Sequence, residues 1–153
     1  MSVYQNEYFI VPREGNYTLF EGLNLKSFLE DDLFEDDLFW DGINVNLKKI
    51  NTYLSGNFPE DNSWSERLKI YGNNDTNSIN LLSKDNMIES MSFRVNFTTD
   101  YTIFLDKLIE LCKLNDLLIV DNDLNVLSLD YQMIMDNIVN SKAFERYKQF
   151  FQE

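Results

Sequence analysis

Residues 87–97 have the sequence MIESMSFRVNF, in which apolar and polar side chains alternate. A period of two predicts a β-strand with one buried face, because successive side chains of a strand point to opposite faces. Met91, Phe93, Val95 and Phe97 are expected on the buried face, and Ser92, Arg94 and Asn96 on the other. We therefore interpret Arg94 as a surface or ion-pair residue. Two shorter runs, at 67–71 and 78–82, precede this strand, and the three predict an antiparallel meander.

Helical spacing dominates the segment that follows. One apolar stripe predicts a core helix over 100–114; it consists of Tyr101, Phe104, Leu105, Leu108 and Leu111/Cys112. Apolar runs at 117–120 and 126–127 predict strands, and stripes at 131–138 and 141–151 predict two more helices. This order predicts an α+β fold, an antiparallel sheet with helices packed on one face. The length of 153 residues suits a single domain, 1–153.

The N-terminal part, 1–60, is expected to form a hairpin and an acidic arm, and residues 64–153 the sheet-and-helix core. The hairpin would pair 8–11 with 17–20, and Pro12 suggests a sheet edge. Residues 28–40 repeat an apolar pair every five positions, which fits neither one helix face nor one strand face, so we expect an irregular arm or short helical turns. Residues 44–54 predict a helix with an asparagine N-cap and with Gly56 just past its end.

Composition excludes several classes of function. The chain has no histidine, which rules out histidine-based acid–base catalysis, Ser-His-Asp and Cys-His nucleophile systems and histidine-ligated metal. Its one cysteine, Cys112, lies in an apolar run and is interpreted as a small buried hydrophobe. We therefore expect no cofactor, no metal and no catalytic residue. No signal peptide or membrane-length apolar stretch is visible, so we expect a soluble, cytoplasmic protein.

Acidic residues are concentrated in two blocks. The chain has 26 acids and 13 bases, a net charge of −13, which argues against sequence-independent binding to nucleic acid or to an anionic membrane. Residues 30–41 carry seven acids and no base, and residues 100–136 carry eight acids and two bases. Acids beside aromatic anchors suit a surface that binds a basic partner. The predicted contact residues are Asp31, Asp32, Phe34, Glu35, Asp36, Asp37, Phe39 and Trp40. The alternative is a solvated acidic face with its aromatic side chains in the core.

Other uses of the acids were weighed. Residues 121–125, DNDLN, begin like an EF-hand calcium loop, but Val126 and Gln132 stand where the loop needs glycine and glutamate, so we expect a capped turn. The carboxylate pairs at 31–32 and 36–37 would suit a carboxylate-dependent hydrolase if rigid elements held them in a cleft. A DNA-mimic inhibitor of a DNA-binding protein would instead space its acids like phosphates along an elongated face.

Several segments of the second half have a familiar arrangement. They are WSERLKIYG at 64–72, IESMSFRV at 88–95, FLDKLIELC at 104–112, and SKAF at 141–144 followed by Phe150-Phe151. Together they resemble the small acidic immunity proteins of bacterial polymorphic-toxin loci, which bind and block a toxin delivered by neighbouring cells. The resemblance covers a little over half the chain and implies a non-enzymatic inhibitor of one toxin domain. With the acidic surface, it predicts a cognate, basic protein toxin, such as a nuclease, as the partner, and no direct contact with nucleic acid.

Overall fold

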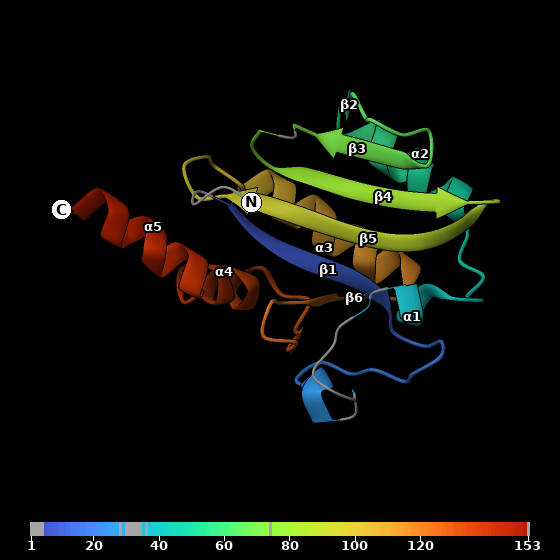
Figure 1. The fold of residues 1–153 in the computed structure, drawn as a ribbon, viewed down its shortest axis with the longest axis horizontal. Helices are drawn as coiled ribbons and strands as arrows, with labels where there is room; N and C mark the ends of the chain where they lie inside the picture. Colours follow the sequence, from blue (N-terminus) through green and yellow to red (C-terminus); the bar gives the residue numbers. More distant parts are fainter. Residues whose placement is uncertain (1–4, 28, 30–34, 36, 74, 153) are drawn as a thin grey trace.

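The computed structural model describes residues 5–27, 29, 35, 37–73 and 75–152. Within them, seven strands form one antiparallel sheet in the order β2-β3-β4-β5-β1-β6-β7 (Figure 1). The strands are β1 (Gln5–Pro12), β2 (Glu60–Asp61), β3 (Leu68–Gly72), β4 (Ser78–Lys84), β5 (Met87–Asn96), β6 (Leu117–Val120) and β7 (Val126–Leu127). The helices are α1 (Asp37–Trp40), α2 (Leu47–Asn57), α3 (Thr102–Asn115), α4 (Tyr131–Val139) and α5 (Lys142–Gln152), with a 3-10 turn at Leu25–Ser27. The predicted α+β class is confirmed.

The strand β5 lies at the centre of the sheet, between β4 and β1. Its predicted buried face is confirmed, since Met91, Phe93 and Val95 are fully buried. Phe93 stands opposite Ile79 of β4 and Tyr8 of β1, so the apolar surface continues across three strands. The rings of Tyr8 and Phe93 stack with their centroids 5.1 Å apart. Cross-strand aromatic pairs of this kind stabilise a sheet beyond the area that they bury.

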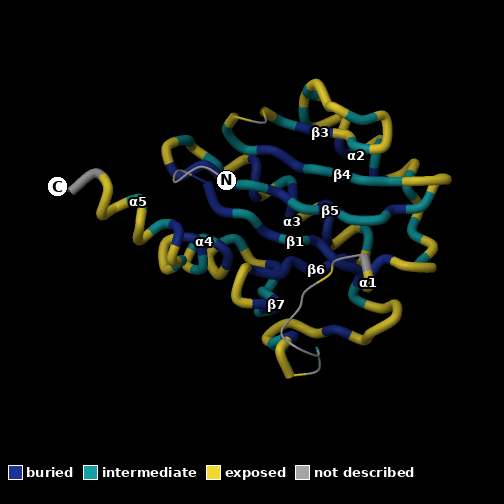
Figure 2. The backbone as a smooth tube through the Cα atoms, viewed as in Figure 1, coloured by how far each residue is buried: buried dark blue, intermediate teal, exposed yellow. Residues whose placement is uncertain are grey.

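Helices α2 and α3 lie together behind the sheet in Figure 1, and Figure 2 shows burial concentrated in the strands and α3. The stripe predicted for α3 is confirmed, because Leu105, Leu108 and Leu111 are fully buried. The ring of Phe104 meets that of Phe93 edge-on, with the centroids 6.2 Å apart, which joins the helix to the central strand. None of the helices in the described part of the chain is both long enough and apolar enough to span a membrane.

The hairpin predicted for residues 8–20 was wrong. The strand β1 instead lies inside the sheet, with β5 on one side and β6 on the other. Its apolar run has buried residues on both faces, such as Ile10 and Val11, as a strand in the interior of a sheet requires. Directly after β1 the chain turns back through an isolated bridge between Glu14 and Thr18, without a second strand at 17–20. Pro12 therefore ends an interior strand and marks no edge.

The helix predicted over 44–54 is displaced toward the C-terminus, to Leu47–Asn57. Its asparagine cap is confirmed, because the Asn46 side chain accepts a hydrogen bond of 3.0 Å from the Lys49 backbone N–H. Gly56 lies inside the helix rather than after it. The helix ends where the Phe58 N–H donates to the Leu54 carbonyl, at 2.8 Å.

Replacing Leu108 should test the core position of α3. Leu108→Ala removes a fully buried side chain, so it should lower the free energy of unfolding by roughly 2–5 kcal/mol through lost burial and a residual cavity. Urea denaturation measures this cost. Ile103 is the matched control on the same helix, because its side chain is 74% exposed. Ile103→Ala should change stability by less than about 0.5 kcal/mol, and equal costs for the two variants would contradict this assignment.

Candidate functional site

The structure separates the residues predicted to bind a partner into three groups. Asp31, Asp32, Phe34 and Asp36 lie outside the described residues, as does the side chain of Asp37, the first residue of α1. Glu35 is exposed just before α1. Phe39 and Trp40 are buried, with 2% and 0% of their surface exposed. The sequence left open whether these two aromatics are core or interface, and the structure places them in the core.

Trp40 attaches α1 to the middle of the sheet. Its indole Nε1–H donates a 3.0 Å hydrogen bond to the carbonyl oxygen of Ile10 in β1. The pairing of β1 with β5 ends at Ile10 opposite Met91. The helix α1 therefore contacts β1 at the point where this pairing ends. A buried indole needs such an acceptor, which explains why the ring points inward. Trp40 therefore holds the C-terminal end of the 30–41 block on the sheet, and it presents no surface to a partner.

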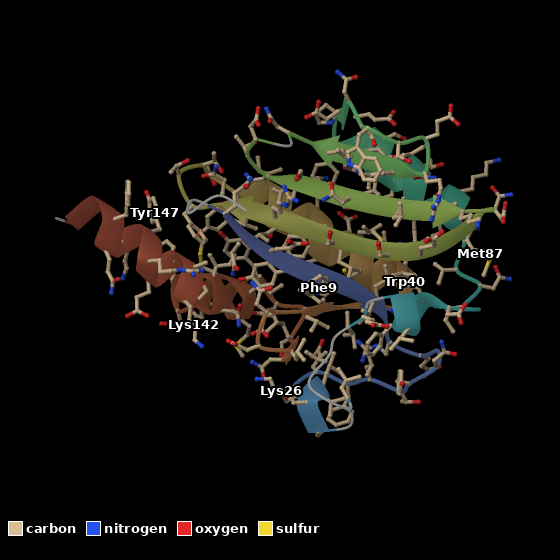
Figure 3. The ribbon with its side chains drawn as sticks, in the orientation of Figure 1. Phe9, Lys26, Trp40, Met87, Lys142 and Tyr147 are labelled. Carbon is tan, nitrogen blue, oxygen red and sulfur yellow. The ribbon has the colours of Figure 1, made fainter. Side chains whose placement is uncertain are left out.

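A groove of about 540 Å³ lies between α1 and the β4–β5 hairpin, and we call it the α1 groove. Figure 3 shows Trp40 and Met87, which both line it, at the same end of the molecule. Its other lining residues are Leu38, Asp41, Gly42, Lys84, Asp85, Ile88 and Glu89. Three of these side chains are acids and one is a base, and Leu38 is 42% exposed. The α1 groove therefore combines acidic and apolar side chains directly after the 30–41 block.

Sequence reasoning missed the contribution of the β4–β5 hairpin to this groove. Asp85 and Asn86 both have positive φ, of 54° and 63°, as a two-residue hairpin turn requires. The Asp-Asn pair predicts the turn from sequence alone. The position of this turn beside α1, however, depends on how the sheet is assembled. Glu89 also forms an ion pair with Arg67, so part of the acidic charge in the groove is locally compensated.

Several acids of the second acidic block, 100–136, are engaged in local contacts. Asp100 accepts a hydrogen bond from the Thr102 N–H at the start of α3, and this bond lowers the pKa of Asp100. Asp130 caps α4 in the same way, by accepting from the Met133 N–H at 3.0 Å. Asp116 forms an ion pair with Arg13, with an Nε–Oδ1 distance of 3.0 Å. Several acids of this block therefore cap helices or form local ion pairs. This favours the interpretation of the block as a solvated acidic face rather than a binding surface.

Asp121 is the buried acid of this block, with 5% of its surface exposed. One carboxylate oxygen accepts from the backbone N–H groups of Asp123 and Asn125, both at 2.9 Å. The other accepts from the side-chain amides of Asn125, at 3.2 Å, and Asn137, at 2.9 Å. Both oxygens are therefore occupied by N–H donors. The capped turn predicted in place of a calcium loop is confirmed.

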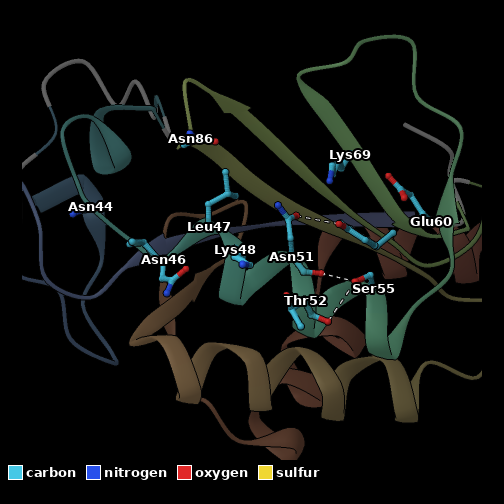
Figure 4. Close-up of a pocket in the computed structure, with 12 residues that line it drawn as sticks. Asn44, Asn46, Leu47, Lys48, Asn51, Thr52, Ser55, Glu60, Lys69 and Asn86 are labelled. Atoms are coloured by element: carbon cyan, nitrogen blue, oxygen red, sulfur yellow. Dashed lines mark hydrogen bonds between the residues drawn. The ribbon is translucent and has the colours of Figure 1, made fainter.

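A groove of about 950 Å³ lies between α2 and β3 (Figure 4). Near its floor the Tyr71 hydroxyl donates to the Asn51 side-chain oxygen at 3.0 Å. Lys48 and Lys69 belong to its lining, whereas Glu60 is the one acid there. Its local charge therefore has the opposite sign to that of the α1 groove, and it does not suit a basic partner.

Cys112 is fully buried, as predicted, and burial raises the pKa of its thiol to about 12. A thiol that is protonated and inaccessible is a poor nucleophile. No group of three or more potential metal-ligating side chains comes together among the residues that the structure describes. Arg94 forms no ion pair within the described chain, and its Nε is buried without a hydrogen-bond partner there.

Two substitutions should show that Trp40 is structural. Trp40→Phe leaves the Ile10 carbonyl without its donor and should cost roughly 1–3 kcal/mol of stability; Trp40→Ala should cost about 3–5 kcal/mol. Trp64, which is 85% exposed, provides the matched control. Thermal and urea unfolding of all three variants is the measurement, and Trp64→Ala should leave both curves nearly unchanged. A Trp40→Ala protein as stable as wild type would refute the buried position.

The role of Asp121 can be tested with an isosteric change. Asp121→Asn replaces an acceptor oxygen with an amide that faces N–H donors, so stability should fall by roughly 1–3 kcal/mol. Asp123→Asn is the control, because Asp123 is exposed in the same turn. Equal urea midpoints for the two variants would show that the Asp121 carboxylate contributes nothing to the turn.

Comparison of the chain with models of known protein families, with curated proteins and with solved structures finds no match, so the resemblance to immunity proteins stays a hypothesis.

Proposed function

We propose that this protein is a non-enzymatic inhibitor of the immunity type, which binds and neutralises a basic bacterial toxin domain. The proposed binding surface consists of the 30–41 block and the α1 groove that follows it. The observation that carries the proposal is the composition of this region. Seven acids without a base lead directly into a groove lined by Asp41, Asp85 and Glu89 and by the partly exposed Leu38.

Such a surface would attract a basic partner electrostatically and would also offer its side chains a groove in which to be buried. Acids raise the rate of encounter with a cationic protein, and the effect weakens as salt screens the charges. A groove beside them can accept a lysine or arginine side chain, whose apolar stem would pack on Leu38 while its charge meets the carboxylates. Because Phe39 and Trp40 are buried, they cannot contact a partner. Leu38 and Met87 would instead supply the apolar part of the interface.

The composition of the chain and the surroundings of two of its described residues, Cys112 and Asp121, support the non-enzymatic part of the proposal. The sequence contains no histidine, and the one thiol is buried. Asp121, the buried acid described above, has both carboxylate oxygens engaged as hydrogen-bond acceptors.

Neutralising the 30–41 block should slow association with the partner. The tagged chain captures its partner from the native host, mass spectrometry identifies the captured protein, and surface plasmon resonance then measures binding kinetics. Asp31, Asp32, Asp36 and Asp37 are changed together to Asn. The on-rate of this variant should fall about ten-fold or more at low salt and less near physiological ionic strength, since long-range attraction is what the change removes.

A control removes the same number of charges elsewhere. The four exposed acids chosen are Asp75, Asp106, Asp123 and Glu145, each changed to its amide. This control should keep an on-rate within about two-fold of wild type, because charges far from the interface act only weakly through screened solvent. If both variants slow association equally, only net charge matters and the block is not the binding surface. Capture of an acidic protein, or of none, would overturn the proposed function itself.

A further inference from the structure

The groove between α2 and β3, which we call the α2 groove, has a polar wall on its helical side. The helix α2 packs on the core through Ile50 and Leu54, which are both fully buried. The Tyr53 hydroxyl holds it to α3 by donating to the Lys107 carbonyl at 3.0 Å. Four side chains at intervals of three or four residues line the groove from the other side of the helix: Lys48, Asn51, Thr52 and Ser55. The helix therefore presents hydrogen-bonding groups, rather than apolar ones, to β3.

The wall formed by the sheet is polar where a row of core residues ends. Met91, Leu81 and Lys69 are successive partners across β5, β4 and β3, so their side chains share one face of the sheet. The first two are buried, whereas Lys69 is exposed and lines the groove. Tyr71 lies two residues further along β3 on the same face, and its hydroxyl donates to Asn51 of α2 at 3.0 Å. This hydrogen bond connects the two walls, so the groove is built on rigid elements.

The α2 groove contains donors that the fold does not use. Within the described chain, Lys48 and Lys69 form neither an ion pair nor a hydrogen bond, and the Asn51 side-chain N–H groups find no acceptor. The neighbouring Lys49, by contrast, donates to the Leu114 carbonyl at 3.2 Å. Figure 4 shows Lys48 and Asn51 on α2, with Lys69 across the groove from them. Two cations and an amide donor thus remain available to a ligand.

We propose that the α2 groove binds a small molecule of the sugar-phosphate class, a phosphate group on a hydroxyl-bearing body. Phosphate oxygens are strong acceptors with nearly two negative charges, which match Lys48 and Lys69. Sugar hydroxyls both donate and accept, and the groove supplies the Glu60 carboxylate as an acceptor and the Thr52 hydroxyl and Asn51 amide as donors. Its volume of about 950 Å³ lies within the roughly 300–1,000 Å³ of small-molecule sites, which exceeds what a phosphate alone needs.

This inference goes beyond the proposed function, because the α2 groove and the α1 groove have no lining residue in common. The net charge of −13 repels an anion at long range. At physiological ionic strength, charges further apart than about 8 Å are largely screened, so the two nearby lysines determine the local attraction.

Isothermal titration calorimetry of the purified chain, at physiological ionic strength, tests the proposal without any partner. The probes are glucose 6-phosphate and ribose 5-phosphate, with glucose and inorganic phosphate for comparison. Glucose lacks the charge and inorganic phosphate lacks the sugar hydroxyls. We expect at least one sugar phosphate to bind about ten-fold or more tightly than either comparison compound, since each lost charged hydrogen bond costs roughly 1.5–3 kcal/mol.

Two variants of the groove and one control locate the binding. Lys48→Gln with Lys69→Gln should weaken it about ten-fold or more, because both cations are lost. The control, Lys26→Gln with Lys113→Gln, removes the same charge from exposed lysines outside the groove and should stay within about two-fold of wild type. Asn51→Asp keeps an acceptor for the Tyr71 hydroxyl but adds a negative charge, so it should abolish binding. Thermal unfolding confirms that each variant is folded.

Three results would overturn the inference. They are the absence of binding by both sugar phosphates, equal affinities of the groove variant and the control variant, and inorganic phosphate that binds as tightly as a sugar phosphate. The last result would show a site for a simple anion rather than for the sugar-phosphate class. No toxin is present in these titrations, so the proposed function stands or falls separately.

Discussion

The pairing of β1 with β5 is the contact on which the rest of the structure depends. It joins residues 5–10 to residues 91–96 and brings the N-terminal segment into the interior of the sheet. The stacked rings of Tyr8 and Phe93 lie on the face that α3 covers. The hydroxyl of Tyr8 then donates to the Asn137 side chain of α4 at 3.0 Å, which ties the far helix to the same strand. Without β1 in this position, β6 would lose one of its two neighbours in the sheet and Trp40 its acceptor on Ile10.

The same constraint decides what the acidic region can be. Because the Trp40 indole binds the Ile10 carbonyl, α1 is fixed beside the β4–β5 hairpin, and the acids of both segments line one groove. Phe39 and Trp40, which the sequence suggested as anchors for a partner, are buried and serve the fold. The surface that remains is acidic, with a modest apolar component at Leu38 and Met87, and such a surface favours fast, salt-sensitive association more than slow dissociation.

Charge in this protein has two separate uses. In the block 100–136, Asp100 and Asp130 accept hydrogen bonds from helix N-termini, Asp121 satisfies a buried turn and Asp116 pairs with Arg13. Acids near helix N-termini also interact favourably with the helix dipole, so they support the fold while they contribute to the net charge. A count of acids along the sequence cannot distinguish these roles from a binding surface.

Much of the fold follows from local sequence. The alternation in 87–97 predicted β5 and its buried face, and the stripe in 100–114 predicted α3, because each pattern reports which side of one element meets the core. The pattern over 44–54 predicted a helix capped by an asparagine, but not the residue at which it begins. The candidate site could be predicted only as a concentration of acids. Tertiary structure decided that 8–11 pair with β5 and β6 rather than with 17–20, that Phe39 and Trp40 face inward, and that Asp85 and Glu89 join Asp41. Those outcomes depend on contacts between residues tens of positions apart, and local periodicity carries no information about which distant strand or helix will be the partner.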